Sequence, residues 1–173
     1  MMKDIELRLI SELMKNSRRS DRELAKAIGV SQPTVSRLIK KLEDKGIIKE
    51  YTMIPDFSKL GYGLLAITLA STKMDLTPEQ IVEARRTATD YVKNKLPQIV
   101  MYERLPVAGN TVAISYHRTY SDYVEFAKLR NDYSFVNVDA IQTYLIDLQD
   151  KMRDEFFRPL TFSTLAKEIT NGH

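Results

Sequence analysis

Apolar residues recur at helical spacing through the first third of the chain, and capping residues mark where the helices begin and end. A second helix is predicted from Ser20, which forms a capping box with Glu23, to Gly29, because glycine tolerates the left-handed turn that ends many helices. A first helix precedes it, since three apolar residues lie four positions apart on one face. These residues are Ile5, Leu9 and Leu13.

A third helix is predicted between Ser31 and Gly46. Ser31 is a favourable N-cap residue, and Pro33 falls in the first turn, where its missing N–H does no harm. The apolar stripe of this helix consists of Val35, Leu38, Ile39 and Leu42. The segment 47–55 that follows is β-branched and alternating, which predicts a strand or short wing. Residues 1–55 are therefore expected to form a winged-helix-like helix-turn-helix domain.

The pattern changes after residues 56–63, whose glycines predict a linker. Period-two stretches then predict strands at 64–71, 99–106, 111–117 and 136–148, and helical patterns cover 77–97 and 120–133. The order β-α-β-β-α-β is that of the ferredoxin-like fold. The chain is therefore expected to be an α+β protein, with this second domain at 64–150.

Residues 151–173 are expected to form a helical tail, broken near Pro159. It either serves assembly or caps its own domain. Its apolar anchors are Phe156, Phe157, Phe162 and Leu165.

Two predicted strands alternate in a way that bears on assembly. Leu65, Ile67 and Leu69 oppose a set of smaller residues around Ala66, and Val112, Ile114 and Tyr116 oppose Ala113 and Ser115. Both helices should cover one face, which leaves the other small and mostly uncharged, unlike the polar face of a half-solvated sheet. A second copy of the same sheet is the expected cover, which predicts a homodimer. The alternative is that the tail folds back over that face.

The break at Gly29 suits a helix-turn-helix, in which two helices cross steeply over a tight turn. Ala25 lets the backbones approach, Gly29 takes a positive φ, and Val35 and Leu38 dock on the second helix. At ~100° per residue, the opposite face of the third helix carries a polar set. That set is Pro33, Ser36, Arg37 and Lys40, flanked by Gln32, Thr34 and Lys41.

This polar set matches the chemistry of base edges in a duplex groove. Arg37 can pair bidentately with guanine and Gln32 with adenine. Ser36 or Thr34 can bond to several base edges or pack on a thymine methyl group. Double-stranded DNA is therefore the predicted partner.

Phosphates are expected to be held by the groups around this set. Lys40 and Lys41 lie further along the helix, and Ser31 with its neighbouring backbone N–H groups can hold a phosphate at the helix start. Arg22, with Arg18 and Arg19, is expected to reach the flanking backbone.

Charge is concentrated in the same part of the chain. Residues 1–50 hold 12 Lys and Arg against 8 Asp and Glu, and the whole chain has a formal net charge of +3. A basic first third fits a nucleic-acid partner, although a solvated helical surface is the alternative. No apolar run reaches the ~18–20 residues needed to span a bilayer, and the start does not read as a signal peptide, so a cytoplasmic location without a membrane partner is expected.

The chain contains no cysteine, which excludes disulfides, thiol nucleophiles and cysteine metal sites. No Ser/His/Asp set or Gly-rich phosphate loop is found, and two histidines do not make a His-rich metal site. Catalytic residues, metal ligands and cofactors are therefore not predicted.

Residues 4 to about 148 resemble the Lrp/AsnC (leucine-responsive, "feast/famine") transcription regulators. The resemblance is densest in ELAKAIGVSQPTVSRLIKKLEDKGIIKEYTMIPDFSKLGY, and its more specific part runs from LEDKGIIKEYT through LGY. It implies a regulator that is not an enzyme and whose paired reading helices address two half-sites one duplex turn apart. It also implies a ferredoxin-like domain for assembly, as a dimer and further as a tetramer or octamer.

The resemblance further implies a small-molecule effector, usually an amino acid, bound between subunits near the turn joining the second and third strands. The matching positions here are Gly109, Asn110 and Thr111. Members that bind amino acids typically carry Gly-Asp in that turn, whereas this chain has Gly-Asn. Without a carboxylate, an α-ammonium group loses a charge-assisted partner, which argues against an amino acid as the effector.

Two rival functions stay open on the sequence alone. Haem-pathway decarboxylases share this two-domain architecture, and His117 beside Arg118 would then bind a carboxylated macrocycle; otherwise His117 is a strand-edge residue bonded to a loop carbonyl. The face around Arg37 has no purpose in a decarboxylase. The second rival is an architectural protein that binds DNA with little sequence preference and compacts it through oligomerisation.

Overall fold

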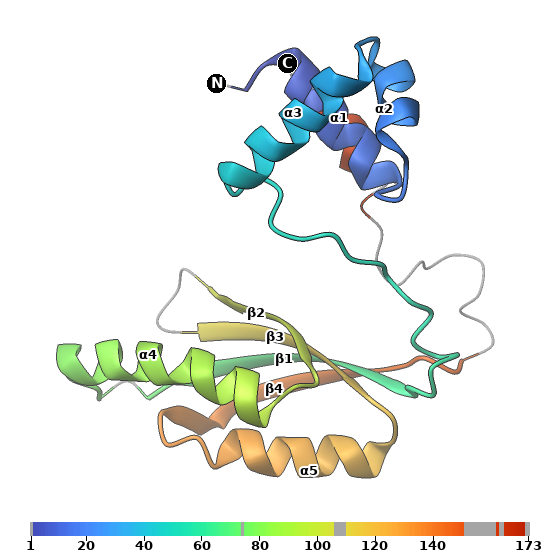
Figure 1. The fold of residues 1–173 in the computed structure, drawn as a ribbon. Helices are drawn as coiled ribbons and strands as arrows, with labels where there is room; N and C mark the ends of the chain where they lie inside the picture. Colours follow the sequence, from blue (N-terminus) through green and yellow to red (C-terminus); the bar gives the residue numbers. More distant parts are fainter. Residues whose placement is uncertain (1, 74, 106–109, 151–161, 163–164, 172–173) are drawn as a thin grey trace. The chain divides into compact units, whose positions relative to one another are not determined.

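The computed structural model describes residues 2–73, 75–105, 110–150, 162 and 165–171, and it divides into two compact units. The first contains Met1–Ile54 together with Glu155–His173, and the second contains Pro55–Asp154. The N-terminal part of the first unit is helical, and the second unit is a sheet with its helices on one side (Figure 1). The expected α+β class, helix-turn-helix followed by a ferredoxin-like domain, is confirmed.

The first unit is built on α1 (Asp4–Lys15), α2 (Asp21–Ile28) and α3 (Gln32–Asp44). The spacing of apolar residues on each helix predicts an inward stripe, and these stripes meet in one core. The fully or almost fully buried members are Leu9, Leu13, Leu24, Ala25, Ile28, Val35 and Leu42, with Leu38 and Ile39 packed against them. This packing fixes which side of α3 faces out.

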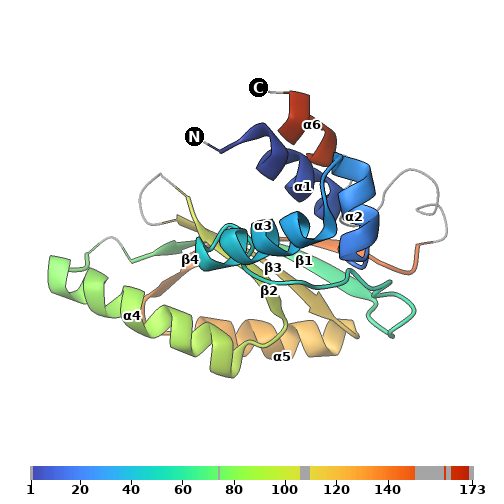
Figure 2. The same ribbon diagram turned by 45° about the horizontal axis from the view of Figure 1, so that its top comes forward.

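A fourth helix, α6 (Leu165–Asn171), completes the first unit. It lies beside α1 (Figure 2), and the Ser11 hydroxyl donates to the Ala166 carbonyl oxygen over 2.7 Å. Ala166 is 0% exposed and Ser11 is 2% exposed. The sequence leaves three roles open for residues 151–173: assembly, capping of their own domain, or covering of the open sheet face. In the described part of this segment, α6 packs on α1 of the first unit rather than on the sheet. Of its expected anchors, Phe162 and Leu165 are exposed, and Phe156 and Phe157 lie outside the described residues.

The strand or wing expected at 47–55 is not formed. After α3 the chain turns at Gly46, where φ is 65°, and the N–H groups of Ile47 and Ile48 both donate to the Leu42 carbonyl oxygen. Residues 49–56 have no regular secondary structure. The described part of this unit is otherwise helical, so an alternating segment finds no strand with which to form a ladder.

The second unit contains β1 (Leu64–Thr72), α4 (Pro78–Lys95), β2 (Ile99–Arg104), β3 (Asn110–His117), α5 (Tyr120–Asn131) and β4 (Val136–Asp147). The sheet order is β2-β3-β1-β4, and each neighbouring pair is antiparallel. Both helices begin at a capping box, Thr77 with Gln80 in α4 and Thr119 with Asp122 in α5. The predicted ferredoxin-like order is confirmed.

The helices cover the small-residue face of this sheet, opposite to expectation. Both α4 and α5 lie on one side of the sheet (Figures 1 and 2). Ala66, Thr68 and Ser115, which point to that side, are almost fully buried. The open face carries the large residues instead, because Ile67 pairs with Ile114 and Tyr144, which point the same way across the strands. Helices can pack closely on a sheet where the side chains between them are small. This is why α4 and α5 lie on the small-residue face and not on the face with the large residues.

Residues 56–63, expected to be a linker, pack on one end of the sheet. The Phe57 ring stacks on Tyr116 with centroids 3.8 Å apart, and Arg118 lies over the Tyr62 ring. Gly63 donates its N–H to the His117 carbonyl oxygen over 3.0 Å, and a Cβ at Gly63 would lie 2.8 Å from the Arg118 carbonyl oxygen. The second unit therefore begins before β1.

Candidate nucleic-acid interface

The turn between α2 and α3 has the geometry of a helix-turn-helix. Ser20 and Glu23 form the expected capping box at the start of α2. Gly29 ends the helix in the left-handed region, with φ of 74° and its N–H donating to the Ala25 carbonyl oxygen over 2.9 Å. Val35, which is 0% exposed, locks α3 onto α2 two residues after the proline of its first turn.

The polar set predicted on α3 lies on its outer side. Thr34 and Lys41 are half-buried at the edges of this side. The exposed members are Ser31, Gln32, Pro33, Ser36, Arg37 and Lys40. The structure therefore brings the predicted reading residues together on one exposed surface, which we call the α3 face, defined by Gln32, Pro33, Ser36, Arg37 and Lys40.

Arg37 lies along its own helix. Its Nε–H donates to the Pro33 carbonyl oxygen over 3.3 Å, and Nη2 donates to the Thr34 hydroxyl over 3.4 Å. Both bonds are long for N–H···O contacts and exposed to water, so they restrain the guanidinium only weakly. The fork is free to swing outward and form two bonds to one acceptor pair.

Three hydroxyls of the predicted set, those of Ser31, Thr34 and Ser36, have protein partners. Ser36 donates to the Asp21 carboxylate at the start of α2. The Ser31 hydroxyl forms a 2.8 Å hydrogen bond with that of Thr34 and does not cap a backbone N–H of α3. Sequence reasoning missed Asp21, because only the crossing of the two helices brings residues fifteen apart together.

Lys41 forms an ion pair inside the unit and is therefore not a free cation. Its Nζ donates to the Glu6 carboxylate over 2.6 Å, and the Lys3 backbone N–H donates to the same carboxylate over 2.9 Å. Glu6 is 3% exposed. The bond from Lys41 and then that from Lys3 lower the pKa of Glu6 to about 2. This pair ties α3 to α1, which differs from the phosphate contact expected for Lys41.

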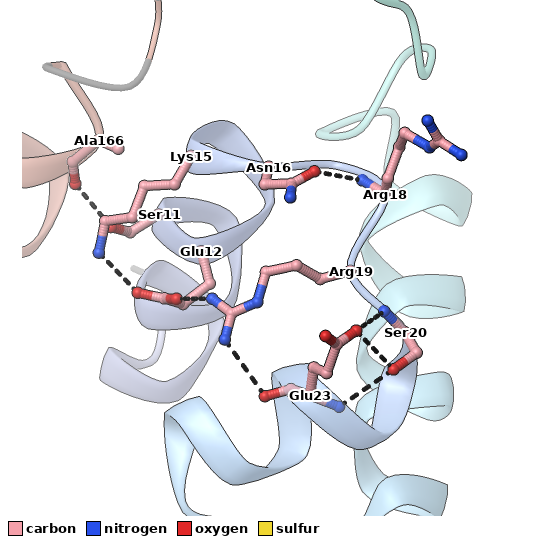
Figure 3. A network of polar contacts seen from close by, with 9 residues as sticks. All are labelled: Ser11, Glu12, Lys15, Asn16, Arg18, Arg19, Ser20, Glu23 and Ala166. Carbon is pink, nitrogen blue, oxygen red and sulfur yellow. Dashed lines mark hydrogen bonds and ion pairs between the residues drawn. The ribbon is translucent and has the colours of Figure 1, made fainter.

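A second network holds α1 against α2 (Figure 3). Glu12 accepts from Lys15 over 2.6 Å and from Arg19, and Nη2 of Arg19 also donates to the Glu23 carbonyl oxygen. The bond from Lys15 is the largest cause that lowers the pKa of Glu12. Arg19 is thus engaged within the unit, whereas Arg22 and Arg18 are exposed, and the Arg18 guanidinium points away from the network.

The predicted effector positions lie at the start of β3. Gly109 is outside the described residues. The Asn110 carbonyl oxygen accepts from the Leu105 N–H over 2.8 Å, and the Thr111 hydroxyl donates to the Ala70 carbonyl oxygen over 3.2 Å. Both described residues are half-buried and take part in the sheet.

His117 is a core residue, contrary to both interpretations made from the sequence. It is 1% exposed under α5, its Nε2 lies 2.8 Å from the Ser115 hydroxyl, and its ring packs on Tyr123 and Phe126. Burial lowers the pKa of His117, which favours the neutral form of the ring. It neither bonds a loop carbonyl nor opens onto a substrate site. The sheet register explains the burial of His117, because it directs the odd-numbered residues at the end of β3 toward the helices.

Within the described ranges, no group of three or more His, Asp or Glu residues is placed to bind a metal ion. Nor does any helix there have the length and apolarity to cross a membrane.

Residues 2–49 match the family model described as winged helix-turn-helix DNA-binding. The matched span ends just after α3 and contains the whole α3 face. The model therefore covers the interface and none of the second unit.

Two curated relatives match part of the chain. The HTH-type transcriptional regulator LrpC of Bacillus subtilis is 45% identical over 69 residues, which is 40% of this chain and 48% of LrpC. LrpA of Pyrococcus horikoshii, another HTH-type transcriptional regulator, is 35% identical over 83 residues, or 48% of this chain and 56% of LrpA. The chain thus matches about half the length of these relatives, which are regulators by name and not enzymes.

Solved structures extend the likeness to both units. The structure of B. subtilis LrpC superposes with a TM-score of 0.64 at 29% identity and covers 84% of this chain and 94% of LrpC. Escherichia coli AsnC gives a TM-score of 0.68 at 16% identity, over 92% of this chain and 98% of AsnC. The latter identity shows a shared fold alone. These comparisons confirm the resemblance drawn from the sequence.

Proposed function

We propose that the chain is a sequence-specific DNA-binding transcriptional regulator of the Lrp/AsnC type. The observation that carries this proposal is the exposed α3 face, held outward by the buried stripe of the same helix and by the left-handed turn at Gly29. A helix presented in this way fits the major groove with its N-terminal residues toward the bases.

The residues of the α3 face divide between bases and phosphates. Arg37 binds a guanine through its fork, and Gln32 binds an adenine. Ser36 and Thr34 contact base edges or a thymine methyl group, with Pro33 packing beside them. Lys40 binds phosphate.

Groups beside the face hold the phosphate backbone. Ser31 and the first N–H groups of α3 lie at the positive end of the helix, where an anion is favoured. Arg22 reaches the flanking backbone from α2, whereas Lys41, which is paired with Glu6, supports the α3 face by tying α3 to α1.

We propose that the regulator works as a homodimer in the cytoplasm. The large apolar residues on the open face of the sheet, among them Ile114 and Tyr144, are an unfavourable surface to leave in water. A second copy of the same sheet covers them and supplies the second α3 for a second half-site. Tetramers or octamers of such dimers, and an effector held near Gly109, Asn110 and Thr111, are further parts of the proposal.

Selection of binding sites from a random duplex pool tests this function directly. A regulator is expected to enrich a two-fold symmetric site and to bind it ~10³-fold or more tightly than random duplex at the same salt concentration. Enrichment of no sequence, with binding that depends on salt alone, would support the architectural protein instead.

A substitution of Arg37 then tests whether this residue recognises a base. Arg37→Ala is expected to relax the preference at one base pair in each half-site and to cost ~1–3 kcal/mol. Arg8→Ala is the matched control, since Arg8 is exposed on α1 of the same unit. If both variants select the wild-type site with equal affinity, Arg37 does not read a base.

A further inference from the structure

A cavity of about 50 Å³ lies within the second unit, between the small-residue face of the sheet and helices α4 and α5. Its walls are mostly apolar, with Ala88 and Val92 from α4 and Ala70 and Ala113 from the sheet. A buried water needs ~10–15 Å³ and two to four polar partners, so this volume holds about four water-sized groups. Because the walls offer few polar groups, a hydrocarbon chain is a more favourable occupant of this cavity than a row of water molecules.

Arg130 of α5 is the one charged residue among the described residues that line this cavity. It is half-buried, and no described carboxylate forms an ion pair with it. Nη1 donates to the Thr68 hydroxyl over 3.4 Å, Nε donates to the Asn131 side-chain oxygen over 3.2 Å, and Cζ lies 5.8 Å from the centre of the Phe126 ring.

All of these partners are neutral, whereas the guanidinium is charged at every physiological pH. A cation that is partly removed from water gains most from an anion, through shorter and stronger charge-assisted bonds. Thr68 adds a second polar group at the same place, since this residue is 3% exposed and its hydroxyl lies 3.2 Å from that of Thr143. The cavity therefore offers one end for an anion and apolar walls for the rest of a ligand.

We propose that this cavity binds a short aliphatic monocarboxylate of about three to five carbons, because the two to four alkyl carbons of such an acid match the volume while its carboxylate lies against Arg130. The carboxylate pairs with Arg130 and Thr68, and the hydrocarbon chain packs among Ala88, Val92 and Ala113. No acidic residue lines the described walls to receive an ammonium group, so a zwitterionic amino acid is excluded by its own positive charge. This site does not depend on the DNA-binding proposal.

Thermal unfolding and calorimetry of the full chain test the site, with butyrate as the probe. Butyrate is expected to raise the unfolding temperature above that in sodium chloride of equal ionic strength, and to bind at least tenfold more tightly than butyramide or 2-aminobutyrate. Butyramide keeps the shape without the charge, and 2-aminobutyrate adds the ammonium group. Equal binding of butyrate and butyramide would overturn the proposal, as would no binding of butyrate.

Two variants locate the binding. Arg130→Gln should weaken butyrate at least tenfold by removing the charge, and Ala88→Leu should do so by filling the cavity while the charge stays. Arg86→Gln is the control, because Arg86 lies on α4 with its side chain in water and pairs only with Glu83. Far-UV circular dichroism shows that each variant is folded. Butyrate binding that is unchanged in both folded cavity variants would place the ligand elsewhere and overturn the site.

Discussion

Gly29 is the residue on which the direction of α3 depends. Its φ of 74° lies in the left-handed region, and no atom lies within 4 Å of the place where a Cβ would be built. Space is therefore available for a side chain, and the constraint comes from the backbone alone. A side chain at such a φ costs ~1–2 kcal/mol, more for a β-branched residue, whereas asparagine tolerates it.

Gly29→Val is accordingly expected to lower the stability of the first unit and to weaken DNA binding, because the strained turn moves α3. Gly29→Asn should retain most of both. Urea unfolding and DNA titration of the two variants measure this. Valine and asparagine variants of equal stability and affinity would show that the turn does not need a left-handed residue.

Glu6 makes the first unit sensitive to acid. Its pKa falls from 4.5 to about 2 on folding, so the folded state favours the carboxylate. The stabilisation is complete above pH 4.5 and is lost as the pH falls toward 2. Glu6→Gln is expected to be less stable than wild type at pH 7 and to lose less stability between pH 5 and 2.

Far-UV circular dichroism during urea unfolding at several pH values follows this effect. Lys41→Met is the matching variant, because it removes the same pair from the other side and should give a similar pH profile. An acid profile of Glu6→Gln that coincides with wild type would contradict the assignment.

At the scale of elements, α6 is expected to act as a structural helix of the DNA-binding unit. Ala166 has no exposed surface against α1, so Ala166→Arg should push α6 away and cost ~1–3 kcal/mol of stability. Hydrogen exchange of the α1 amides is expected to become faster, while the sheet amides keep their protection. Lys167→Ala is the control, since Lys167 is exposed. Unchanged exchange in Ala166→Arg would show that α6 does not stabilise α1.

Periodicity and capping residues predict the order of the elements well, because they are local. Ser20, Thr77 and Gly29 each mark a helix end that the structure has. The segment 47–55 fails for the opposite reason: its pattern is that of a strand, and pairing depends on a partner that no local pattern can supply. The contact of α6 with α1 is equally non-local.

The covered face of the sheet is a second example. The alternation around Leu65 and Ala66 assigns the residues of β1 to two faces of the sheet. Neither face is polar enough to indicate which of the two the helices leave exposed. The choice follows from how closely α4 and α5 approach, which depends on small residues facing the helices. Within the candidate site, the exposed side of α3 could be predicted from Val35 and Leu42, whereas the partners Glu6 and Asp21 could not, since they come from other helices.

At the scale of the whole molecule, the open face of the sheet is expected to decide the oligomeric state. Tyr144 is 52% exposed on this face, so Tyr144→Asp places a charge there without a large change to the core of the unit. The variant is expected to sediment as a monomer at concentrations where the wild type is a dimer or larger.

Val82→Asp is the control for this variant. Val82 is 63% exposed on α4, which covers the opposite face of the sheet, and its substitution should leave the mass unchanged. A wild-type chain that sediments as a monomer, or a Tyr144→Asp chain that keeps the wild-type mass, would contradict assembly through this face.

The contact between Ser11 and Ala166 joins residues 155 positions apart. The unit that contains α1 is therefore complete only when the two ends of the described sequence have met across the whole sheet unit between them. A chain cut short before residue 165 would contain every strand of the sheet and still lack the helix that packs on α1.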